Sequence, residues 1–155
     1  MIKLLNNLYL FKGLTADQLN KVEEIAESKF FSKDDPIFSL GEAADSFFVI
    51  QHGTVRLELD DEGSQANRVE ISVLGTGSHF GEMGFLDNEP RSAHATAASN
   101  SSIVCIGYAP METLLESDQA IALHVYRELA RFLCRRLRLT TLDLSYERSK
   151  NLGYL

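Results

Sequence analysis

The chain has 155 residues, a length that fits one domain with a sizeable buried core. Its formal net charge of −7 argues against nucleic acid as a direct partner, because binding a polyanion requires a net basic face. No apolar run approaches the roughly 18 residues needed to span a bilayer, and Asn6 and Asn7 interrupt the start too soon for a signal peptide. We therefore expect no membrane partner and a cytoplasmic location.

Residues 1–28 are expected to form the N-terminal helices. Gly13 ends a predicted short helix over residues 2–11. The next helix has a complete start signal, because Thr15 as N-cap and Gln18 three residues later fit a capping box. Leu14 before the cap and Leu19 after it have the spacing of a hydrophobic staple.

Residues 29–108 change to a period of two, which predicts strands. Val55, Leu57 and Leu59 alternate with polar residues, and turn residues such as Gly41 and Gly53 separate the runs. Many short strands at this spacing predict an antiparallel β-barrel or jelly roll. The fold class is therefore mainly β with flanking helices, in one domain over residues 1–155.

Residues 109–155 are expected to form the C-terminal helices. Pro110 suits a first helical turn, and Ser117 or Asp118 suits the cap of a long helix that runs to about Leu144. Packing on one barrel needs only the first half of such a helix. The apolar second half therefore predicts a homodimer through this helix. The alternative is that it packs on the N-terminal helices of its own chain.

The remaining reactive side chains indicate no catalytic, metal or cofactor site. Cys105 and Cys134 lie in apolar runs and are expected to be buried, reduced thiols. A metal-dependent cupin-like enzyme would need clustered histidines, and here they are dispersed: His52, His79, His94 and His124. No nucleophile and base stand together either.

Residues 80–92 interrupt the strand pattern with a segment that carries chemistry. Gly81 permits close approach of a ligand, and free N–H groups where a short helix begins favour a phosphate. Arg91, placed by Pro90, can hold two phosphate oxygens, and Ser92 adds a hydroxyl. Glu82 would repel an anion unless it faces a hydroxyl group. The residues thus suit a sugar phosphate with one free hydroxyl, although a surface turn with a Glu–Arg pair is the alternative.

This segment resembles the phosphate-binding cassette of the cyclic nucleotide-binding domain family. That cassette reads Phe-Gly-Glu, then a short variable turn, then Pro-Arg followed by a small residue and Ala, as in Phe80-Gly81-Glu82 and Pro90-Arg91-Ser92-Ala93 here. The resemblance extends over nearly the whole chain. It includes residues 11–15, 41–50, 53–55 and 74–77.

The resemblance implies a role for each cassette residue and a ligand, cAMP or cGMP. Glu82 would bind the ribose 2′-hydroxyl, and Arg91 with Ser92 would bind the cyclic phosphate. The backbone N–H groups of Gly81, Glu82 and Met83 would line the rest. A side chain of the lid helix, Arg136 or else Arg135, would cover the base. The apolar wall near the base would come from Val69, Ile71 and Leu74.

The function that follows is a cyclic-nucleotide-sensing regulatory module. Bacterial transcription regulators of this family continue from the lid helix into a winged helix-turn-helix, and this chain ends at Leu155. We therefore expect a module without its own effector domain, which acts on a separate effector protein. The alternative is an interaction or adaptor module that no longer binds nucleotide. His94 stands where the family often has Thr or Ser, and this leaves the choice of base open.

Overall fold

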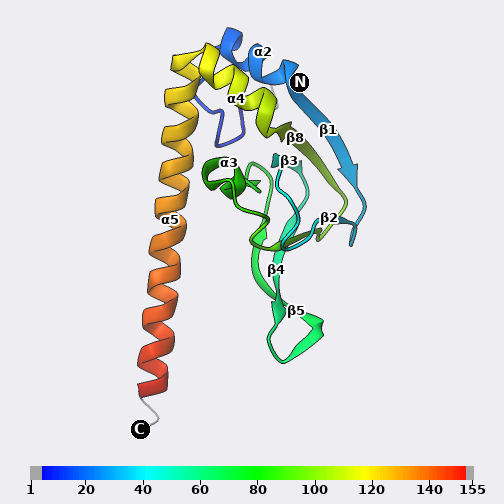
Figure 1. The fold of residues 1–155 in the computed structure, drawn as a ribbon, viewed down its shortest axis with the longest axis vertical. Helices are drawn as coiled ribbons and strands as arrows, with labels where there is room; N and C mark the ends of the chain where they lie inside the picture. Colours follow the sequence, from blue (N-terminus) through cyan, green and yellow to red (C-terminus); the bar gives the residue numbers. More distant parts are fainter. Residues whose placement is uncertain (1–4, 153–155) are drawn as a thin grey trace.

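The structure, a computed structural model, describes residues 5–152. Eight strands form two four-stranded antiparallel sheets, and one long helix stands beside them (Figure 1). This confirms the expected fold of antiparallel sheets, flanking helices and a long C-terminal helix. The first sheet has the order β1 (Ala26–Phe31), β8 (Ser101–Gly107), β3 (Ser46–His52) and β6 (His79–Phe80). The second has the order β2 (Pro36–Phe38), β7 (His94–Ala97), β4 (Val55–Asp61) and β5 (Ser64–Leu74).

The sheets are accompanied by the helices α2 (Ala16–Glu24), α3 (Met83–Asp87), α4 (Tyr108–Ser117) and α5 (Gln119–Leu152). The capping box of α2 is present, because Gln18 N–H donates to Thr15 Oγ1 at 3.3 Å and Thr15 N–H donates to Gln18 Oε1 at 2.8 Å. The predicted helix over residues 2–11 is wrong for residues 6–11, which form turns around Asn6 and Asn7; residues 2–4 lie outside the described residues. Asparagine favours such turns over a helix interior.

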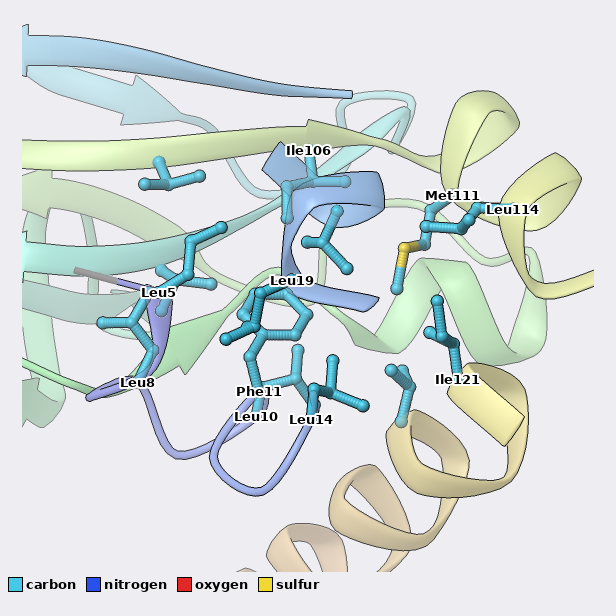
Figure 2. Close-up of a cluster of buried hydrophobic side chains, with 14 of the residues drawn as sticks. Leu5, Leu8, Leu10, Phe11, Leu14, Leu19, Ile106, Met111, Leu114 and Ile121 are labelled. Carbon is cyan, nitrogen blue, oxygen red and sulfur yellow. The ribbon is translucent and has the colours of Figure 1, made fainter. Parts of the chain in front are cut away.

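The helices and the first sheet enclose one apolar cluster, which joins the N-terminal segment to α4 and α5. Figure 2 shows this cluster, which extends from Leu5 through Phe11 and Leu19 to Met111 and Ile121. A second cluster fills the space between the two sheets. It contains Phe48, Ile50, Val55, Leu57, Phe80, Ala95, Ile103 and Cys105. The first cluster therefore fixes where α5 begins, and the second fixes the strands around the cassette.

Helix α5 is packed along its first half and exposed along its second. Asp118 caps it, because Asp118 Oδ1 accepts from Ile121 N–H at 3.1 Å. Val125 and Leu129 are buried, whereas Leu137 is 68% exposed. Cys105 is buried as expected, but the prediction for Cys134 is wrong, since its side chain is exposed. Cys134 lies on the side of the helix that turns away from the barrel.

Candidate functional site

The cassette forms a tight turn between β6 and α3. Gly81 adopts φ +76°, a conformation that favours glycine, and Glu82 immediately precedes the first turn of α3. Asn88 ends this helix in the left-handed conformation with φ +59°. The chain then returns to the sheet through Pro90. The short helix predicted within residues 80–92 is therefore present, over Met83–Asp87.

Arg91 lies buried inside this turn, and its guanidinium hydrogen-bonds to Gly81, the residue at the start of the turn. Its Nη1 donates to the Gly81 carbonyl at 3.1 Å and to the Tyr108 hydroxyl at 3.4 Å. Its Nη2 lies 3.5 Å from Ser46 Oγ and 3.7 Å from a carboxylate oxygen of Asp45. Among residues 5–152, its third nitrogen, Nε, is buried without a hydrogen-bond partner. One donor of the guanidinium therefore stays available.

Aromatic rings hold the guanidinium of Arg91 in place. Its central carbon lies 4.2 Å from the ring centroid of Phe38 and 5.5 Å from that of Phe48. Such cation–π contacts stabilise a desolvated cation without using its N–H donors. Because Phe38 belongs to β2 and Phe48 to β3, both sheets contribute to the orientation of this one side chain.

Glu82 is buried in the same region, with 2% of its surface exposed. In the described part of the chain its Oε2 atom has no hydrogen-bond partner. Burial raises the pKa of Glu82 above its ordinary value, against the opposing effects of a backbone N–H and the positive charge of Arg136. The carboxyl group therefore has an unused acceptor atom in a poorly hydrated place.

Seven of the nine predicted site residues line one cavity, whose empty volume is about 610 Å³ including its opening to solvent. These are Ile71, Gly81, Glu82, Met83, Arg91, Ser92 and Arg136. Sequence reasoning did not assign the other half of the wall to the site. It consists of Phe38, Leu57, Leu59, Phe80, Gly84, Pro90 and Ala93. The cassette motif contains Phe80, Gly84, Pro90 and Ala93 and could have indicated them, whereas Phe38 has no sequence signal.

Val69 and Leu74 are not among the described residues that line this cavity, so their place near the base stays a prediction. Leu74 pairs with the buried Val55 and packs into the cluster between the sheets. Val69 lies further out on the hairpin and is 51% exposed. The pairing register shifts in between, and Ile71 is the extra residue of this bulge. A bulge redirects a side chain, and here Ile71 reaches the cavity.

The structure defines the places of three residues whose roles the sequence left open. Arg136 of α5 lines the cavity, while Arg135 lines a neighbouring hollow with His79 and Phe132. His94 lies on β7, where its Nδ1 accepts from Leu40 N–H at 3.1 Å and its Nε2 lies 2.9 Å from Asp60 Oδ1. Both ring nitrogens are therefore occupied by neighbours in the fold.

Residues 5–152 contain neither an arrangement of metal ligands nor a helix suited to a membrane. Within that range, no cluster of histidine, cysteine, aspartate and glutamate side chains is arranged to hold a metal ion. Nor does any helix in that range have the length and apolar character to cross a membrane.

Comparison with known proteins agrees with this geometry. The family model described as "Cyclic nucleotide-binding domain" matches residues 28–118. A cAMP-dependent protein kinase regulatory subunit of Candida albicans is 36% identical over 101 residues, which cover 65% of this chain and 20% of that protein. A cGMP-dependent protein kinase of Caenorhabditis briggsae is 33% identical over 97 residues, covering 63% of this chain and 13% of that one.

The fold has a close counterpart among solved structures. The catabolite activator protein of Thermus thermophilus superposes with a TM-score of 0.76 at 28% identity, over 88% of this chain and 62% of that chain. The chain thus spans about a fifth or less of the two kinase-related proteins and somewhat under two thirds of the catabolite activator protein. The match over residues 28–118 includes the whole cassette and all of both sheets except the first two residues of β1, and the chain belongs to the cyclic nucleotide-binding domain family.

Proposed function

We propose that this protein binds cAMP or cGMP in the cassette cavity and acts as a regulatory sensor rather than as an enzyme. One observation carries the proposal. In the described residues, Arg91 Nε is a buried donor and Glu82 Oε2 a buried acceptor, both without a partner, and both side chains line the same cavity. Buried polar atoms are nearly always hydrogen-bonded in native proteins, so a complementary ligand is expected here.

The required ligand has two features at once. An anionic oxygen would accept from Arg91, and a hydroxyl group would donate to Glu82. A 3′,5′-cyclic nucleotide brings a singly charged phosphate and a free 2′-hydroxyl on the same ribose. Ser92, whose exposed hydroxyl lies 3.4 Å from Met83 Sδ, can turn to add a donor to the phosphate. The family membership supports the same ligand class.

The base would occupy the apolar part of the cavity. Leu57, Leu59 and Ile71 supply this wall, and Arg136 approaches it from α5. A guanidinium can stack on a purine ring. Neither adenine nor guanine is singled out by these residues, and the relatives named above include both a cAMP-dependent and a cGMP-dependent kinase.

The response would pass through α5 to a separate effector or to a second copy. Arg136 is on this helix, and Phe85 of the cassette stacks on Tyr126 of α5 with ring centroids 6.3 Å apart. A ligand that changes the cassette would therefore shift the balance between two positions of α5. The exposed second half of α5 is the proposed homodimer contact.

Thermal unfolding with added nucleotide tests the proposal directly. A ligand that binds only the folded chain raises the melting temperature in proportion to RT ln(1 + [L]/Kd). We expect a rise with cAMP or cGMP, a smaller one with the matching 2′-deoxy analogue, and none with adenosine. No shift with either cyclic nucleotide at millimolar concentration would contradict the proposal and favour an adaptor module that does not bind nucleotide.

A further inference from the structure

Tyr108 places its hydroxyl at the centre of the cassette although it belongs to another element. It is the first residue of α4 and follows β8 directly. Its hydroxyl donates a hydrogen bond to the Gly81 carbonyl and accepts one from Arg91 Nη1 at 3.4 Å. Because Arg91 Nη1 also donates to that carbonyl, at 3.1 Å, the three groups form a closed triangle.

Two cassette glycines make room for this triangle. A Cβ atom on Gly84 would lie 3.1 Å from the Tyr108 hydroxyl, and a Cβ on Gly81 would lie 2.9 Å from Arg91 Nη1. The Tyr108 ring is held as well, because it packs on Phe85 of α3 with centroids 5.4 Å apart. The hydroxyl therefore has little freedom to take another partner.

The triangle determines which donor Arg91 offers to the cavity. With Nη1 bound to Gly81 and Tyr108, and Nη2 directed at Ser46 and Asp45, the guanidinium is fixed, and in the described structure its Nε is a buried donor without a partner. If the Tyr108 hydroxyl were absent, Nη1 would keep one acceptor and the guanidinium could rotate.

We propose that Tyr108 is a positioning residue, whose hydroxyl fixes the Gly81 carbonyl and the Arg91 guanidinium together and so sets the affinity for the cyclic phosphate. This inference rests on the proposed function. It also connects the phosphate site to α4, the helix that leads into α5. A movement of α4 would change the ligand site through one hydrogen-bonded contact.

Tyr108→Phe tests this role, because it removes the hydroxyl and keeps the ring on Phe85. The full chain is titrated with cAMP and cGMP in a thermal-shift series, and the tighter ligand is used for comparison. We expect about a 10-fold weaker Kd, the value of one hydrogen bond to a charged group. Tyr9→Phe is the matched control, since Tyr9 is 62% exposed and is not among the described residues that line the cavity, and it should change Kd less than twofold.

A double-mutant cycle separates positioning from a merely structural effect. If Tyr108 acts through Arg91, its substitution costs much less affinity in an Arg91→Lys background than in the native chain. Equal losses in the two backgrounds, or an unchanged Kd for Tyr108→Phe in the native chain, would overturn the inference while leaving the proposed function intact. A native chain that binds neither nucleotide would overturn both.

Discussion

Arg91 and Glu82 are nine residues apart in the sequence and line the same cavity, and each contains a buried polar atom, a donor in Arg91 and an acceptor in Glu82. Nε of Arg91 and Oε2 of Glu82 are the two atoms concerned, and neither has a partner within residues 5–152. Leaving both unsatisfied destabilises the free chain, whereas a ligand that pairs with both recovers that energy. The two unpaired atoms therefore lower the stability of the ligand-free chain and favour ligand binding. Substitutions of Arg91 and Glu82 can measure both effects.

Arg91→Ala should weaken binding of cAMP or cGMP by about 2–5 kcal/mol, as expected when one partner of a buried, hydrogen-bonded charge pair is removed. Isothermal titration calorimetry of the folded variant measures this loss. Arg131→Ala is the control, because Arg131 is an exposed α5 residue paired with Glu128 and should leave the affinity unchanged. Equal affinities for Arg91→Ala and the native chain would rule out the cassette as the phosphate site.

Glu82→Gln should stabilise the free chain and weaken the complex. The charged carboxylate is disfavoured by burial, which is why the pKa of Glu82 is raised. Removing the charge should raise the free energy of unfolding at neutral pH by about 1–3 kcal/mol, the usual cost of an unsatisfied buried group. The nucleotide should bind about 10-fold or more weakly, because its 2′-hydroxyl loses a charged acceptor.

The opposite signs of these two effects make the Glu82 prediction specific. Chemical denaturation without ligand gives the first effect, and calorimetry gives the second. The 2′-deoxy analogue is the internal control, since it should bind the native chain and the variant with similar affinity. A variant that loses stability and affinity together would indicate a structural role for Glu82 instead.

How much of this site the sequence predicts depends on how local each feature is. The capping box at Thr15 and the cassette around Glu82 and Arg91 are local patterns, and the structure contains both. Phe38 could not be predicted, because it reaches Arg91 only through the pairing of β2 with β7. The position of such a ring depends on tertiary structure rather than on neighbouring residues.

The hairpin of β4 and β5 shows the same limit. Alternation along β5 suggests that Val69 and Ile71 have equivalent places, but the bulge opposite Leu57 and Glu58 separates them. Ile71 then lines the cavity and Val69 does not, among the lining residues described. A register shift of one residue depends on the whole sheet, so a periodicity of two does not reveal it. Cys134 was wrongly expected to be buried, because an apolar run does not reveal which side of a long helix faces the barrel.

The stability of the chain should fall between pH 6.5 and pH 4 because of His79. This side chain is 2% exposed, and its ring lies 4.0 Å from that of Phe132 on α5. Burial, with the positive charges of Arg136 and Arg135, lowers the pKa of His79 from 6.5 to about 4. Below pH 6.5 the unfolded chain takes up a proton that the folded chain excludes. The free energy of unfolding should therefore decrease as the pH falls, by at most about 3 kcal/mol.

His79→Phe removes this titration and keeps a ring against Phe132. Urea denaturation at pH 7.5 and pH 5 should show a smaller pH effect for His79→Phe than for the native chain. His52→Gln is the control, because His52 is exposed at the end of β3 and its loss should leave the pH effect unchanged. The same pH effect in all three proteins would show that His79 is not responsible.

The exposed second half of α5 should mediate self-association. Cys134, Leu137, Arg138, Thr141 and Leu142 line one apolar groove on this helix. Their spacing of three, four, seven and eight residues places them on one helix face, the arrangement of a helix that packs against a partner. Leu137→Glu puts a charge in the centre of this face, so we expect sedimentation velocity to show a shift from dimer to monomer and at least a 10-fold weaker dimer.

Leu139→Glu provides a matched control for the dimer prediction. Leu139 is 62% exposed, similar to the 68% of Leu137, but two residues turn an α-helix by about 200° and place it on the other side. Leu139→Glu should therefore leave the dimer intact. In a parallel pair of α5 helices the two copies of Cys134 would also face each other, and mild oxidation should then cross-link the native chain and Cys105→Ser but not Cys134→Ser. A native chain that sediments as a monomer at high micromolar concentration would contradict the homodimer, because removing the apolar face from water is the only driving force proposed for it.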